Sequence, residues 1–167
     1  MAINSTPLDA AAQSYVSVAE MTAYAVLRPN VAAWTAIAAG TAGEAVLVAA
    51  CNRLESERYK GTKATSGQRL KWPRYGVLDD DDEEYAADVV PRFIKEAQME
   101  LALAVANAGA TDFFADTGLE GFDSTSVGPL SVTINHQFMA GQLPATVARL
   151  LSSMTRGGGG GPSLVRG

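Results

Sequence analysis

The stretch PRFIKEAQMELALAVANAG, residues 91–109, predicts the longest helix of the chain and with it the class of fold. Its apolar residues recur every three or four positions, which places them on one helical face. Pro91 suits the first helical position and Gly109 suits the end. The apolar stripe consists of Phe93, Ile94, Ala97, Leu101, Ala104, Val105 and Ala108. Met99 and Leu103 widen it, so we expect more than one element to pack on this helix.

Two short helices are predicted before it. The sequence Ser17-Val18-Ala19-Glu20 has a hydroxyl and a carboxylate three positions apart, the pattern of a capping box at a helix start. The helix should run to about Arg28, because a proline follows. Asn30 can cap the next helix, over residues 31–39.

A third helix of this half should begin at Thr41-Ala42-Gly43-Glu44, a second capping box, and end near Arg58. Its apolar residues have the spacing of a core-facing amphipathic helix. They are Val46, Leu47, Ala50, Cys51 and Leu54.

The hydrophobic period changes after residue 110. Apolar and polar residues alternate over residues 130–135, which predicts a half-buried strand, and Gly128-Pro129 predicts a turn from a preceding strand. A β-hairpin is therefore expected at about residues 122–136, followed by a helix that begins at Pro144. The fold class is mainly α: a small bundle of four to five helices with a short β-hairpin.

Extended arms are expected at both ends. We assign residues 1–14 to an N-terminal arm, 15–154 to one helical domain with a charged connector at 58–90, and 155–167 to a glycine-rich C-terminal arm. Five consecutive glycines cannot pack a core and are costly to order. We therefore expect the arms to become ordered by touching other copies or a larger complex.

Charge is segregated along the connector. Residues 53–75 contain seven of the thirteen basic residues against two acids, whereas residues 79–88 contain seven acids and no basic residue. The net charge of −5 argues against free-standing, non-specific nucleic-acid binding by the chain as a whole. Neighbouring segments of opposite sign are typical of surfaces that meet other charged surfaces.

The basic stretch has three interpretations. Tyr59, Trp72 and Tyr75, with the surrounding lysines and arginines, could grip single-stranded DNA by base stacking and phosphate contact. The same residues could anchor a protein–protein contact. Alternatively, Trp72 and Pro73 fold back onto the helical core while the lysines stay in water.

No catalytic or metal-binding pattern is found in the sequence. His136 is the single histidine and is interpreted as a partly exposed polar residue in a turn. Cys51 lies on an apolar helix face and is interpreted as a small buried hydrophobic residue. The acids after position 79 lack the glycine and glutamate of a calcium loop, and no Gly-Lys-Ser/Thr follows the pentaglycine. We expect no enzyme, no cofactor and no metal. No apolar run reaches the length of a membrane span, so we expect a soluble protein without a membrane partner.

Several motifs, in this order, resemble a known family. They are Tyr15–Glu20, Trp34, Asn52–Ser56, Tyr59–Gly61, Gln68–Val77, Val90-Pro91, Glu100–Ala102 and Val127–Val132. The block Leu70-Lys71-Trp72-Pro73-Arg74-Tyr75-Gly76-Val77 is the most specific of them. The order is similar to that of head-to-tail adaptor (head completion, or neck) proteins of long-tailed bacteriophages, a family also labelled DnaT-like single-stranded DNA-binding proteins.

The resemblance implies a structural protein of the virion neck, assembled in the host cytoplasm. It implies a ring of about twelve copies between the portal and the tail, whose channel passes the genomic double-stranded DNA. The implied partners are other copies of the chain, the portal protein and a tail, tail-terminator or stopper protein. It also implies a C-terminal arm that reaches into the portal, here Arg156, Gly157, Gly158, Gly159, Gly160, Gly161, Pro162, Ser163, Leu164, Val165, Arg166 and Gly167.

Two further sets of interface residues are predicted. The connector set comprises Arg53, Arg58, Lys60, Leu70, Trp72, Pro73 and Arg74. The acidic docking loop, expected to pair with basic surface on a neighbouring protein, comprises Asp79, Asp80, Asp81, Asp82, Glu83 and Glu84.

Overall fold

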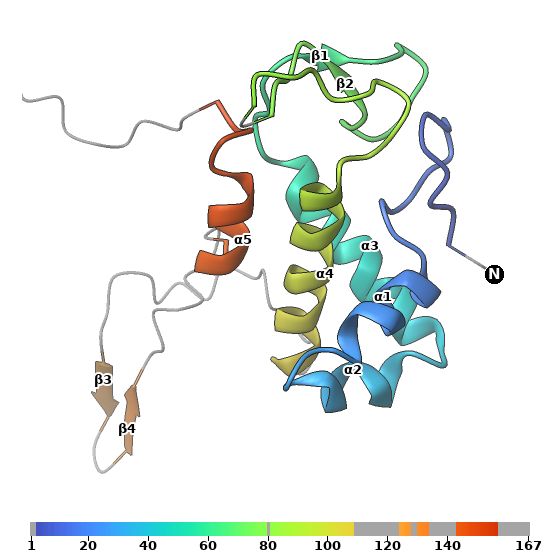
Figure 1. Cartoon of the computed structure of the whole chain (residues 1–167). Coiled ribbons are helices and arrows are strands. Elements are labelled where there is room, and N and C mark those ends of the chain that lie inside the picture. The colour runs from blue at the N-terminus through green and yellow to red at the C-terminus, as the bar shows by residue number, and fades with distance from the viewer. Residues whose placement is uncertain (1–2, 80, 109–123, 128–129, 134–142, 157–167) are drawn as a thin grey trace, which may run out of the picture.

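The computed structural model describes residues 3–79, 81–108, 124–127, 130–133 and 143–156. In these ranges the fold is mainly α, as predicted, with helices α1 (Val18–Ala25), α2 (Val31–Ile37), α3 (Thr41–Glu55), α4 (Arg92–Asn107) and α5 (Ala145–Leu151). Helix α4 contacts the other four and lies between α5 and the α1–α3 group (Figure 1). Among the described residues no helix is long and apolar enough to cross a membrane.

Two small antiparallel sheets accompany the helices. Strands β3 (Ser124–Val127) and β4 (Leu130–Thr133) pair as the predicted hairpin. Strands β1 (Thr62–Lys63) and β2 (Arg74–Tyr75) form a second pair inside the basic connector, which the sequence did not predict. This second pair places two basic residues, Lys63 and Arg74, opposite each other.

The apolar face of α4 is largely buried, as its period predicted, although Ala108 at the C-cap is exposed. Ile94, Ala97 and Leu101 are fully buried, and the widening residues Met99 and Leu103 are buried too. Trp72 packs on this helix, since its ring meets Phe93 edge to face at a centroid distance of 5.7 Å. The interpretation in which Trp72 folds back onto the core is therefore confirmed.

Helix ends differ from the sequence expectations. Ser17 and Glu20 form the predicted capping box of α1. By contrast, Gly40 occupies the N-cap of α3, so the second predicted capping box, at Thr41, is wrong. Asn30 stands at the N-cap of α2 but makes no side-chain cap bond. Helices α1 and α3 end three residues earlier than predicted, because each closes in a tight turn with hydrogen bonds to the third residue back.

The N-terminal segment lies against its own subunit from residue 3 onward. The Gln13 and Ser14 N–H groups donate to the Asn4 carbonyl at 2.7 and 3.2 Å. The Arg69 guanidinium donates to the Ala12 carbonyl at 3.1 Å, and Ala12 is buried. The expectation that this arm needs another molecule to order it is therefore wrong for residues 3–14. Residues 157–167, the larger part of the predicted portal arm, lie outside the described residues.

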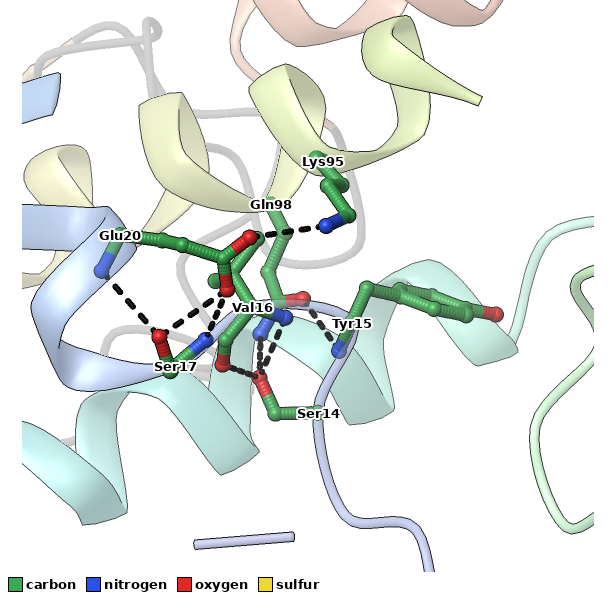
Figure 2. Close-up of polar contacts among 7 residues, drawn as sticks. All are labelled: Ser14, Tyr15, Val16, Ser17, Glu20, Lys95 and Gln98. Atoms are coloured by element: carbon green, nitrogen blue, oxygen red, sulfur yellow. Dashed lines mark hydrogen bonds and ion pairs between the residues drawn. The ribbon is translucent and has the colours of Figure 1, made fainter. Parts of the chain in front are cut away.

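A buried glutamine joins this segment to the bundle (Figure 2). Gln98 of α4 is fully buried, and its Oε1 accepts from the Tyr15 N–H at 2.9 Å. Its Nε2 donates to Ser14 Oγ at 2.6 Å and to the Leu47 carbonyl of α3 at 2.9 Å. One side chain thus connects the N-terminal segment, α3 and α4.

An ion pair beside this glutamine fastens α1 to α4 (Figure 2). Lys95 Nζ lies 2.8 Å from Glu20 Oε1, and Glu20 also accepts from the Ser17 N–H at 2.8 Å. Burial raises the pKa of the Glu20 carboxyl, but the hydrogen bonds from Lys95 and Ser17 outweigh it, so the net pKa is lowered.

Candidate nucleic-acid interface

The basic connector forms one side of a surface groove of about 310 Å³. Seven residues line it: Glu57, Arg58, Tyr59, Lys63, Lys71, Arg74 and Arg156. Five of these are cationic and one is acidic. Arg58 follows α3, Lys63 and Arg74 belong to β1 and β2, Lys71 precedes β2, and Arg156 follows α5.

Arg156 reaches the groove because the end of α5 pairs with the residues after α3. Tyr59 and Thr155 form an antiparallel bridge. The Lys60 N–H donates to the Met154 carbonyl at 2.8 Å, and the Arg156 N–H donates to the Arg58 carbonyl at 2.7 Å. The first residue of the predicted portal arm is thus tied to the folded body.

The β1–β2 pair places two cations opposite each other. Lys63 and Arg74 are direct cross-strand partners, an arrangement that like charges normally destabilise. The pair is possible because Gly61 has φ +68°, and a Cβ there would lie 2.1 Å from the Tyr75 carbonyl oxygen. Only glycine fits at this close approach.

Three of the groove cations donate hydrogen bonds to neutral acceptors. Arg74 donates to the carbonyls of Lys60, Gly61 and Lys71 at 2.6, 2.7 and 3.0 Å. Lys71 Nζ donates to the Glu57 carbonyl at 2.7 Å, and Lys63 Nζ donates to the carbonyls of Gln68 and Arg69. Carbonyl oxygens fix these side chains without neutralising them.

The positive charge of the groove is therefore poorly compensated. The Glu57 carboxylate is engaged by Arg53, whose Nη1 lies 2.6 Å from its Oε1. The pKa of the Arg74 guanidinium is lowered, first by burial and also by the like charge of Arg156. A bound anion would relieve this repulsion, which makes the groove suited to phosphate groups.

A hydrogen-bond chain from the bundle supports the groove. The Glu55 carboxylate accepts from the Lys71 N–H at 2.9 Å and from the Tyr15 hydroxyl. Burial, together with the nearby Glu55 charge, raises the pKa of the Tyr15 phenol, so it remains a donor. Since Tyr15 is itself fixed by Gln98, the backbone of Lys71 is positioned from the core outward.

Two of the three aromatic residues predicted to stack on DNA bases are not accessible. Trp72 is 1% exposed and Tyr59 is 4% exposed, and the two rings meet edge to face. Tyr59 donates its hydroxyl to the Leu54 carbonyl at 3.0 Å. Their predicted stacking role is wrong, because both rings are buried in the hydrophobic core. Tyr75, on β2 next to Arg74, is 53% exposed but does not line the groove.

The remaining connector residues divide between core and surface. Leu70, Trp72 and Pro73 are buried, whereas Lys60 is exposed but does not line the groove. Arg53 and Glu57 form an ion pair at the end of α3. Lys63, Lys71 and Arg156 complete the groove but were absent from the predicted connector set. Lys63 and Lys71 could have been found from the basic stretch, whereas nothing in the sequence links Arg156 to it.

The acidic docking loop is a closed turn. Asp79 Oδ1 accepts from the N–H groups of Asp81 and Glu83, both at 2.9 Å, and the Asp79 N–H donates to the Glu83 carbonyl at 2.8 Å. Glu84 pairs with Leu78 in a β-bridge and accepts from the Gly76 N–H at 2.6 Å. Asp81, Asp82, Glu83 and Glu84 are exposed. Asp80 lies outside the described residues.

Cys51 has the surroundings of a structural residue. It is fully buried on α3, and burial, with the charge of Glu55, raises the pKa of its thiol to about 12. The thiol therefore stays protonated at neutral pH. His136 lies outside the described residues.

Comparison with known proteins identifies a family. No curated protein and no solved structure matches this chain. One family model, described as "Putative DnaT-like ssDNA binding protein", matches residues 1–167. Because the match spans the whole chain, the protein belongs to this DnaT-like family.

Proposed function

We propose that the protein binds single-stranded DNA through the basic groove, mainly by contacts to phosphates. The supporting observation is the convergence of five cations from three separate parts of the chain, with one acid among them. The side-chain hydrogen bonds of Lys63, Lys71 and Arg74 go to carbonyl oxygens, so their charge remains available to an anion. Membership of a family described by single-stranded DNA binding supports the same function.

The expected binding mode is largely independent of base sequence. Phosphate contacts position a strand but do not read its bases. Of the three aromatic residues of the connector, Tyr75 alone is exposed enough to stack on a base. Because the chain has a net charge of −5, affinity depends on the groove and should fall steeply with salt.

Fluorescence anisotropy of a short labelled oligo(dT) tests this proposal. The double variant R58E/R156E reverses two groove charges whose side chains are exposed, and it should abolish binding at low salt. The matched control is Arg149→Glu, since Arg149 is an exposed arginine on α5 that does not line the groove. Circular dichroism confirms that each variant folds. Failure of the wild type to bind oligo(dT), or equal loss in the control, would overturn the proposal.

As a second candidate, we propose a structural role as a phage head-to-tail adaptor. In this role the chain forms a homo-oligomeric ring between portal and tail in the virion neck, without catalysis or a cofactor. The supporting observation is that the acidic docking loop is pre-formed and exposed on the same connector as the groove. Surfaces of opposite sign on each subunit suit a head-to-tail ring.

Native mass spectrometry and particle imaging test the second candidate. A ring of many copies, and its incorporation between heads and tails, is the expected result. Deleting residues 157–167 should leave the helical domain folded but block the joining of heads to tails. A protein that stays monomeric and does not associate with virions would exclude the adaptor role. Normal joining of heads to tails by the truncated chain would exclude a role for residues 157–167.

A further inference from the structure

We infer that the basic groove also receives the acidic docking loop of a second copy, so that self-association and DNA binding compete for one site. The inference rests on the proposed function, because it adds a protein occupant to the DNA site. Two features support it: uncompensated positive charge in the groove, and exposed carboxylates next to Asp79, whose side chain accepts two backbone N–H groups.

The carboxylates of the loop have no basic partner within the described residues. No salt bridge there joins Asp79, Asp81, Asp82, Glu83 or Glu84 to a lysine or arginine. Asp79 accepts two backbone N–H groups inside the loop, and Glu84 accepts the N–H of Gly76, which precedes the loop. The side chains of Asp81, Asp82 and Glu83 are exposed and remain for an external cation.

In the part of the chain that the structure describes, the loop forms no salt bridge with a groove cation of its own subunit, and its base is anchored. At its base, Leu78 and Glu84 form a β-bridge, and the Tyr85 N–H donates to the Val77 carbonyl at 3.0 Å. Val77 is buried, which fixes the base to the core. The occupant in this inference is the loop of another copy, in a head-to-tail contact that leaves a free groove on one copy and a free loop on the other.

The loop also matches the groove in chemistry. Carboxylates and phosphates both accept hydrogen bonds from the planar fork of arginine, and Arg58 and Arg156 are the exposed arginines of the groove. Because the loop is held by its own hydrogen bonds, little chain entropy is lost when it docks. DNA and loop thus present alternative anions to the same cations.

A charge-swap pair tests the inference by analytical ultracentrifugation. Variant one, R58E/R156E, leaves three cations and three acids in the groove, which removes its net positive charge, and keeps the acidic loop. Variant two, D81K/E83K, keeps the basic groove and leaves four acids and two lysines in the loop. Each variant alone should sediment as a monomer, because the attraction between its groove and its loop is weakened. An equimolar mixture should regain association, because the acidic loop of variant one then meets the basic groove of variant two.

Two further measurements complete the design. Excess short oligo(dT) should dissociate wild-type assemblies, whereas Asp88→Lys, an exposed acid outside the loop, should associate as the wild type does. Three results would each overturn the inference: D81K/E83K associates as strongly as the wild type, the mixture does not recover association, or the wild type is monomeric under all conditions. The DNA proposal is judged separately, since D81K/E83K keeps the groove and should still bind oligo(dT).

Discussion

Replacing Gln98 by leucine tests whether the bundle depends on its buried amide. The change removes three hydrogen bonds, to the Tyr15 N–H, Ser14 Oγ and the Leu47 carbonyl. The Tyr15 N–H is then buried without an acceptor, which costs about 1–3 kcal/mol, and each other bond contributes about 0.5–1.5 kcal/mol. We therefore expect the free energy of unfolding to fall by about 2–6 kcal/mol, a large share of the roughly 5–15 kcal/mol of a typical domain.

Urea unfolding followed by tryptophan fluorescence measures this loss, since Trp34 and Trp72 are both buried. The slope against urea should stay unchanged, because the surface exposed on unfolding is the same. Gln13→Leu is the control: Gln13 is exposed, and its replacement should change stability by less than about 0.5 kcal/mol. A loss below about 1 kcal/mol for Gln98→Leu would refute the reasoning, because it would mean that the freed groups find other partners.

Three further predictions concern the groove and the fold. Replacing Arg58 and Arg156 by alanine should reduce the slope of the logarithm of the binding constant against the logarithm of the salt concentration by about 1.4, since each phosphate contact to a single strand contributes about 0.7. Anisotropy titrations measure this slope, and an unchanged slope would place both arginines outside the interface. The pKa of Glu20 is lowered in the folded protein, so its carboxylate stabilises the fold. This contribution is complete at pH values above the ordinary pKa of 4.5, and it is lost as the pH falls through the pKa of the folded protein. Glu20→Gln should therefore lose less thermal stability than the wild type on acidification below that point, and equal losses would contradict the linkage. Gly61→Ala should weaken both folding and oligo(dT) binding because its Cβ would lie 2.1 Å from a backbone oxygen, whereas Gly67→Ala, with nothing within 4 Å, should change neither.

The helices could be predicted from the sequence because their signals are local. The period of α4 and the capping box of Ser17 each depend on residues within a few turns of each other. The predicted cap at Thr41 failed for a local reason as well. Gly40 adopts the extended conformation of an N-cap, so Thr41 is already inside the helix.

The groove could be predicted only in part. The charge of residues 53–75 indicated a basic surface, but composition does not tell which of the side chains will be buried in the core. Trp72 and Tyr59 looked like stacking residues and proved to be buried, because the ring of Phe93 offers Trp72 an apolar neighbour. Arg156 joins through a backbone pairing between segments almost a hundred positions apart, for which no sequence pattern exists.

The Tyr59–Thr155 bridge has a consequence for the order of events during synthesis. A growing chain exposes most of its basic residues early, yet the groove is completed only when the final turn of α5 has emerged and docked. Contacts between such distant segments are slow to form. The newborn polypeptide thus lacks a finished anion site until residue 156 has left the ribosome, and the proposed DNA binding would wait for the same step.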